Sequence, residues 1–245
     1  MSAPLIVALF GPTGVGKTAV ALELADLLRA RGEDPVAVNC DSLQVYAGLE
    51  RLTGAATAAE RARLEHRLLG FVAVTDDFSV GDYMPLAHAA IDAALAAGRR
   101  PLVVGGTGLY LRAALADLSL EPAPPGTESE LWSPQTRHPT AIFGLTMERA
   151  ALYARIDARV EAIAAAGAEE EVRAAVALGP GRTVAKALGF RELPAGDIEG
   201  MKRRSRNYAR RQMVWLRKLP NLTRIDVGGR TPTAVAAEIA AALSR

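Results

Sequence analysis

The sequence contains a single cysteine, almost no excess charge and no long apolar run among its 245 residues. Because Cys40 stands alone, an internal disulfide and a cysteine-rich metal site are both excluded. The formal net charge is only +2, so any surface that binds nucleic acid must be local. No basic N-terminal stretch leads into an apolar core, and no apolar run is long enough to span a membrane. We therefore expect a cytoplasmic protein without membrane contact, and the sequence gives no sign of a protein partner.

What the sequence does contain is a complete phosphate-binding loop of the form G-x-x-x-x-G-K-[ST]. The apolar run 4–10 before the loop predicts a buried strand, and residues 18–30 after it predict a helix. In this setting the glycines let backbone amides face a phosphate, and the helix N-terminus and Lys17 add positive charge. Thr18 would offer its hydroxyl to Mg²⁺. A glycine-rich turn that only joins strand to helix is the alternative. The loop predicts a ligand with two or three phosphates, such as ATP, and consists of Gly11, Pro12, Thr13, Gly14, Val15, Gly16, Lys17 and Thr18.

A second apolar run, residues 35–40, ends at Asp41. A strand, a helix and a strand within this length predict that the two strands pair in parallel through a right-handed crossover. Because the carboxyl ends of such strands gather the chemistry of the fold, Asp41 should lie beside the phosphate loop. Three interpretations of Asp41 are open: the N-cap of a following helix, the Mg²⁺-side aspartate of a nucleotide hydrolase, or a general base beside a bound diphosphate.

The run 101–110 is an apolar strand that breaks into glycines and continues as a helix. An ATPase usually places a metal-holding or catalytic acid at the end of such a strand, whereas this chain has Gly105, Gly106 and the hydroxyl of Thr107 there. This composition weakens the hydrolase interpretation. The glycines would allow a ligand to approach closely, and Thr107 would either donate a hydrogen bond to a phosphate oxygen or cap the helix.

The segment 197–219 predicts a helix with a local positive charge that the net value hides. Such a stripe suits an RNA backbone because counterion release favours binding, and the rings of Tyr208 and Trp215 could stack on unpaired bases. The alternatives are a solvated charged face and, for Trp215 and Val214, a place in the core. The basic residues, with no acid among them, are Lys202, Arg203, Arg204, Arg206, Arg210, Arg211, Arg217 and Lys218.

The other elements follow from apolar periodicity and from capping and breaking residues. A short helix is expected within 55–69, where His66 packs against the core or faces solvent. Half of the residues are hydrophobic, which suits an α/β fold with a parallel sheet flanked by helices. The further elements predicted are helices at 79–97, 148–166, 168–178 and 231–243 and strands at 140–147 and 222–227.

Four motifs together resemble the tRNA dimethylallyltransferase family: residues 11–18, 41–46, 103–111 and 210–217. The resemblance covers most of the chain, from residue 4 to about residue 227. It implies a P-loop NTPase-like fold and transfer of a dimethylallyl group from dimethylallyl diphosphate to N6 of the adenosine 3′-adjacent to the anticodon in tRNA. The phosphate loop would then hold a diphosphate leaving group with Mg²⁺, and not a nucleotide.

The resemblance also implies roles for individual residues. Asp41 would be the general base that accepts a proton from the N6 amine, and Thr107 would contact the diphosphate side as a second catalytic residue. Fixed amides, Lys17 and Mg²⁺ at Thr18 would stabilise the charge that develops on the leaving group. The target base would leave the anticodon stack to enter the site. The residues expected to contact the tRNA anticodon loop are Asp41, Ser42, Leu43, Gln44, Arg206, Arg210 and Arg211.

The chain departs from the family pattern at residues 119–139, a linker rich in proline, glycine and acid that replaces most of a helical insertion. We therefore expect a first part of the catalytic core at 1–118, the linker, a second part with the basic helix at 140–245, and a reduced helical appendage. Where relatives carry Gly-Thr-Ala-Lys-Pro, the chain has Leu-Thr-Gly-Ala-Ala at 52–56. Two alternatives are a small-molecule or nucleoside kinase and a non-catalytic RNA- or nucleotide-binding relic.

Overall fold

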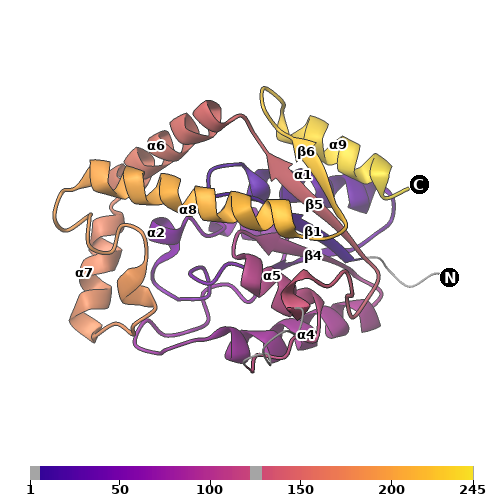
Figure 1. Cartoon of the computed structure of the whole chain (residues 1–245), viewed down its shortest axis with the longest axis horizontal. Helices are drawn as coiled ribbons and strands as arrows, with labels where there is room; N and C mark the ends of the chain where they lie inside the picture. Colours follow the sequence, from indigo (N-terminus) through magenta and orange to yellow (C-terminus); the bar gives the residue numbers. More distant parts are fainter. Residues whose placement is uncertain (1–5, 122–128, 245) are drawn as a thin grey trace.

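The computed structural model, which describes residues 6–121 and 129–244, is built on one parallel sheet of six strands (Figure 1). The strand order is β3-β2-β4-β1-β5-β6, and all neighbouring strands pair in parallel. The strands are β1 (Ile6–Phe10), β2 (Pro35–Asn39), β3 (His66–Arg67), β4 (Arg100–Gly105), β5 (Thr140–Thr146) and β6 (Leu222–Asp226).

Helices cover both faces of this sheet, because the strands are apolar on both sides. Along β1, Val7 and Leu9 face one core together with α1 and α9, while Ile6, Ala8 and Phe10 face a second core with α4, α5 and the end of α8. In Figure 1, α8 extends from the region of α7 to the middle of the molecule, and the chain then continues to β6. The helices are α1 (Lys17–Ala30), α2 (Glu50–Thr53), α3 (Ala58–Arg63), α4 (Val80–Ala96), α5 (Gly108–Leu115), α6 (Arg149–Ala165), α7 (Ala168–Leu178), α8 (Ile198–Lys218) and α9 (Pro232–Ala242), with short 3₁₀ turns η1 (Glu130–Trp132) and η2 (Val184–Lys186).

The predicted α/β class, with a parallel sheet flanked by helices, is confirmed. The prediction that β1 pairs with β2 is wrong, because β4 lies between them and pairs with both. Four of the six residues of β4 are buried, and β4 needs a neighbour on each side to pair its backbone. Strand β2, in turn, pairs on its outer side with the two-residue edge strand β3.

The helix expected within 55–69 is also only partly present. A capping box between Thr57 and Glu60 starts α3, but Leu64 is already extended and ends the helix after six residues. His66 then belongs to β3 and pairs with Ala37. The pattern of apolar residues did not predict this break, since a two-residue edge strand is too short to show a period.

A reduced helical appendage stands beside the sheet edge. A third apolar core joins α2, α7, η2 and the first turn of α8, with Leu52, Val172, Val184 and Met201 among its members. Of the expected linker, residues 122–128 lie outside the described residues, as do residues 4 and 5 of the first predicted strand. No helix in the described part of the chain is both long and apolar enough to cross a membrane.

Candidate active site

The phosphate loop joins β1 to α1 at the carboxyl edge of the sheet. Gly14 and Gly16 have φ angles of 79° and 100°, a conformation that favours glycine, so these two positions of the motif follow from backbone geometry. Gly16 is the N-cap of α1 and makes no side-chain cap, which leaves the positive end of the helix facing the loop. The loop therefore has the form that binds an anion.

Lys17 is held across this loop. Its Nζ donates to the carbonyl oxygens of Gly11 and Pro12, each 3.0 Å away. Burial lowers the pKa of Lys17 to about 8, although the nearby carboxylate of Asp41 opposes that shift. A bound anion would restore the favourable setting for the positive charge, so Lys17 is arranged to receive one.

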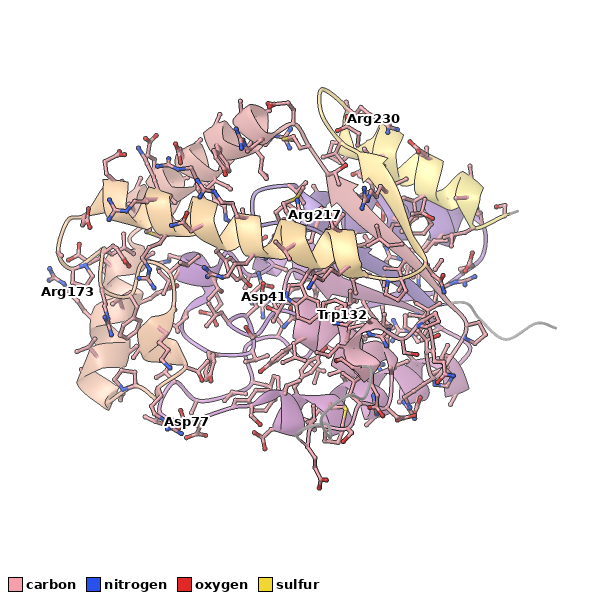
Figure 2. The ribbon with its side chains drawn as sticks, in the orientation of Figure 1. Asp41, Asp77, Trp132, Arg173, Arg217 and Arg230 are labelled. Atoms are coloured by element: carbon pink, nitrogen blue, oxygen red, sulfur yellow. The ribbon has the colours of Figure 1, made fainter. Side chains whose placement is uncertain are left out.

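Asp41 follows β2, close to Lys17, and Figure 2 shows it near the middle of the molecule, alongside the ribbon of α8. Its Oδ1 accepts a hydrogen bond from the backbone N–H of Leu43 at 3.0 Å, and its own N–H donates to Oδ1 of Asn39 at 3.1 Å. Residues 42–45 form a turn, so the interpretation of Asp41 as a helix N-cap is wrong. Among the described residues, no donor pairs with the other carboxylate oxygen, Oδ2, which leaves it able to accept a proton.

Thr107 stands between Asp41's turn and α8. It is the N-cap residue of α5, but its side chain makes no capping bond. Its Oγ1 instead accepts from the N–H of Ser42 at 3.1 Å and lies 3.3 Å from Oγ of Ser42 and 3.4 Å from the hydroxyl of Tyr208. The structure therefore joins Thr107 to Ser42 and to α8, and the capping interpretation of its hydroxyl is wrong.

The glycines at the end of β4 and at the start of α5 are needed for protein packing. A Cβ on Gly105 would lie 2.5 Å from the backbone of Cys40, one on Gly106 would lie 2.3 Å from Nε2 of Gln212, and one on Gly108 would lie 2.2 Å from the indole of Trp215. These contacts explain glycine at the three positions, while the expectation that Gly105 and Gly106 allow a ligand to approach closely stays a prediction. The three glycines let β2 and α8 approach the turn, and Trp215 belongs to the core face of α8, while Val214 is 41% exposed.

The phosphate loop, Asp41 and Gln44 line one open cavity of about 580 Å³. Gln44 Nε2 reaches the carbonyl oxygens of Thr53 and Gly54, at 3.4 and 3.2 Å. The lining side chains and loop residues that bear on chemistry are Thr13, Gly14, Gly16, Lys17, Thr18, Asp41, Leu43, Gln44, Arg155, Arg159, Tyr208 and Gln212.

Sequence analysis missed two cations in this cavity, Arg155 and Arg159 of α6. Arg159 Nη2 donates to the carbonyl of Thr53 at 3.1 Å, and burial lowers the pKa of Arg159 while Asp41 raises it. The sequence does contain a feature that could have predicted them: the two arginines are four residues apart, which places them on one face of a helix. It was hidden because the same helix also carries a regular apolar stripe, which indicated only core packing.

The donor set of the cavity fits a magnesium ion carried by a phosphate ligand. Mg²⁺ keeps several waters and takes one or two protein oxygens together with substrate phosphates. Thr18 and Asp41 supply such oxygens on the wall of the same cavity. Within the described ranges, no three carboxylate, histidine or cysteine side chains cluster as a protein-only metal site.

The basic stripe of α8 is partly neutralised by acids, most of which come from other segments of the chain. Arg206 binds both carboxylate oxygens of Asp157, each at 2.7 Å, so its charge is compensated from α6. The acidic partners were not visible in the stripe itself, because they are contributed by α6, by the segment before α8 and by the first turn of α8. The pairs are Lys202 with Glu161 and Glu199, Arg204 with Glu192, and Arg206 with Asp157.

Arg210 and Arg211 keep their charges on the surface. Arg210 Nε donates to the hydroxyl of Tyr153 at 2.9 Å, and the guanidinium of Arg211 lies 5.4 Å from the ring centre of Tyr208. Neither forms an ion pair with another described residue. A second hollow of about 330 Å³ begins beside Tyr208, and its polar lining is Ser42, Thr183, Lys186, Arg204, Asn207, Tyr208 and Arg211. The hollow connects the exposed charges of α8 to the turn that holds Asp41.

Comparison with solved structures identifies the fold. The tRNA isopentenylpyrophosphate transferase of Bacillus halodurans superposes with a TM-score of 0.84 and 26% identity, over 99% of this chain and 97% of that one. A eukaryotic dimethylallyltransferase acting on tRNA shares the fold at a TM-score of 0.80 and 20% identity. The P-loop NTPase-like fold that the sequence predicted is therefore confirmed.

Comparison of sequences identifies the family. The family model described as IPP transferase matches residues 44–137 and 126–219. The tRNA dimethylallyltransferase of Pseudarthrobacter chlorophenolicus is 31% identical over 92% of this chain and 95% of its own length. That of Rhodospirillum centenum is 35% identical over 89% and 90%. Both alignments run over 288 positions, more than the 245 residues of this chain, so they contain gaps. As its four motifs predicted, the chain belongs to the IPP transferase family of enzymes.

Proposed function

We propose that this protein transfers a dimethylallyl group from dimethylallyl diphosphate to N6 of the adenosine 3′-adjacent to the anticodon in tRNA. The observation that carries the proposal is the cavity that brings the phosphate loop and the carboxylate of Asp41 together, in a chain of this family. Family membership favours prenyl transfer over the kinase alternative. Action on tRNA would place the protein in the cytoplasm.

On the donor side, the phosphate loop would bind the diphosphate. The phosphate loop, the N-terminus of α1 and Lys17 line the cavity, and Arg155 and Arg159 of α6 add two more positive charges to its lining. Negative charge grows on the diphosphate as the allylic C–O bond breaks, so these groups stabilise the transition state more than the bound donor. Mg²⁺, which Thr18 would hold, would supply further neutralisation of that charge when bound.

On the acceptor side, Asp41 would act as the base. The adenine N6 nitrogen forms a bond to the allylic carbon, the diphosphate leaves with the electrons of the C–O bond, and the N6 proton passes to Asp41. The hydrogen bond from Leu43 to Oδ1 fixes the orientation of the carboxylate, and Oδ2 remains available for the proton. Thr107 would help to hold the diphosphate side through the contacts that position its hydroxyl.

The tRNA would approach from the hollow beside Tyr208. Ser42, Leu43 and Gln44 follow Asp41 in the turn and would border the flipped adenosine. Arg210 and Arg211 would meet the RNA backbone on the exposed side of α8, and Arg206 would contribute less because it is paired. Residues 119–139 would serve as the linker that replaces the family's insertion, between core segments 1–118 and 140–245.

The test is a transfer assay with labelled dimethylallyl diphosphate, Mg²⁺ and an unmodified tRNA that has adenosine next to the anticodon, followed by nucleoside analysis. Label at N6 of that adenosine is the expected result. ATP consumption with a small-molecule acceptor and no prenyl transfer would favour a kinase. Binding of the donor and of tRNA without product would indicate a relic that has lost activity.

A further inference from the structure

Gln212 of α8 is one of the few polar side chains in the interior. It is only 3% exposed, and both of its polar atoms are used by the protein. Oε1 accepts from the backbone N–H of Thr13 at 2.8 Å, and Nε2 donates to the carbonyl oxygen of Gly106 at 2.9 Å. One amide group therefore links residue 13 of the phosphate loop to residue 106, and both Thr13 and Gln212 line the cavity.

The linked segments are two backbone turns at the carboxyl ends of β1 and β4, where the diphosphate of the proposed function would bind. Thr13 is in the middle of the phosphate loop, and Gly106 is in the turn that follows β4. A Cβ at Gly106 would lie 2.3 Å from Gln212, 3.1 Å from the carbonyl of Gly11 and 3.4 Å from Nζ of Lys17, so the three segments are packed against one another. Glycine at this position makes room for the amide of Gln212.

We propose that Gln212 is a positioning residue that fixes the phosphate loop against the turn after β4 and thereby sets the affinity for the diphosphate. The inference rests on the proposed function for the identity of the ligand, but the clamp itself is a property of the protein without ligand. Without the amide of Gln212, the N–H of Thr13 and the carbonyl of Gly106 would lose their buried partners, and the loop would have to move to satisfy them.

The contacts around Gln212 extend the clamp toward the acceptor side. One helical turn earlier in α8, the side chain of Tyr208 interacts with Gln212 and also reaches Thr107. Tyr208 and Gln212 are four residues apart and therefore lie on the same face of the helix. A single helix face thus holds the phosphate loop, the turn after β4 and the hydroxyl beside Ser42 in register.

The variant Gln212→Leu tests the clamp because leucine fills similar space and removes both hydrogen bonds. Gln212→Asn keeps the amide but shortens it by one methylene, so it cannot span both partners. Val214→Ala is the matched control, since this side chain lies two residues away on the same helix and is exposed. The probes are inorganic diphosphate with Mg²⁺ by calorimetry, donor KM against kcat, tRNA affinity, and amide hydrogen exchange of residues 11–16 without ligand.

We expect Gln212→Leu to weaken diphosphate binding about tenfold, as the loss of these two bonds implies. The donor KM should rise by a similar factor, while tRNA affinity stays the same. Amide exchange of residues 11–16 should accelerate in the empty protein, and the rest of the sheet should keep its protection. Gln212→Asn should also weaken diphosphate binding, raise the donor KM and accelerate amide exchange of residues 11–16. Val214→Ala should match the parent protein in every readout.

Unchanged diphosphate affinity, or unchanged exchange of residues 11–16, in a folded Gln212→Leu protein would overturn the proposal. If Gln212→Leu does not fold, the same two readouts on Gln212→Asn decide. Failure of the proposed function would look different. In that case the parent protein would not prenylate tRNA, yet its diphosphate affinity and loop exchange would still respond to Gln212.

Discussion

Replacing Asp41 by asparagine removes the negative charge and the proton acceptor while keeping the size of the side chain. The turn should survive, because the amide oxygen of asparagine can accept the 3.0 Å hydrogen bond from the N–H of Leu43. The hydrogen bond from residue 41 to Asn39 uses the backbone N–H and does not depend on the side chain. Asp41→Asn therefore isolates the chemical role of the carboxylate from its structural role.

The size of the effect follows from the proposed role of Asp41. A positioned general base contributes about 10²- to 10⁴-fold to a rate, which corresponds to about 2.7–5.5 kcal/mol. The kcat of Asp41→Asn should fall within this range. Donor affinity should stay the same or improve, since a carboxylate near the anionic diphosphate is lost. Asp41→Ala should lose the turn bond as well, at a further cost of about 1 kcal/mol in stability.

The assay is single-turnover transfer of labelled dimethylallyl to tRNA, with donor affinity measured separately by calorimetry and stability by urea denaturation. The loss of a general base implies a much larger fall in turnover than about fivefold. If the turnover of Asp41→Asn falls by no more than that, Asp41 is not the base. If Asp41→Asn instead loses donor affinity and stability together, the carboxylate acts mainly on structure. A fall in kcat alone is the result that the geometry predicts.

Three further predictions concern charge and packing. Affinity for inorganic diphosphate should fall by up to about tenfold per pH unit above pH 8. The reason is that the pKa of Lys17 is lowered to about 8, so above that pH the empty site must take up a proton to bind the anion. Lys17→Arg should remove this decline, and an affinity of the parent protein that does not change with pH would contradict the prediction. Arg211→Gln should reduce the salt dependence of tRNA binding by about one phosphate contact. Arg206→Gln should reduce it less, because the carboxylate of Asp157 already compensates the charge of Arg206. Equal changes in the slope of log affinity against log salt concentration for the two variants would refute the prediction that, of the two, only Arg211 has a free charge. Gly108→Ala should destabilise the fold by about 1–3 kcal/mol in urea denaturation, because its Cβ would lie 2.2 Å from Trp215, and an unchanged midpoint would show that the indole can move aside.

Elements with strong local signals were predicted closely. The segment 168–178 matches α7 at both ends, and the helix predicted at 79–97 is α4, whose N-cap Ser79 accepts a hydrogen bond from the N–H of Asp82. Both depend on residues within one or two turns of each other, so a single sequence contains the information. The order of the strands does not have this property, since β4 comes between β1 and β2 only when the sheet assembles.

The sequence by itself determined the fold class and the family, because four motifs stand in the family's order and the motif at 11–18 dictates a particular backbone conformation, with Gly14 and Gly16 at positive φ. Only the tertiary structure decided which distant side chains complete the site. Arg155 and Arg159 reach the cavity from α6, and Gln212 bonds to Thr13 across 199 positions of sequence. Acids from other segments likewise decide which arginines of α8 keep a free charge. Local spacing specifies backbone geometry, whereas contacts between distant segments exist only after the helices have packed on the sheet.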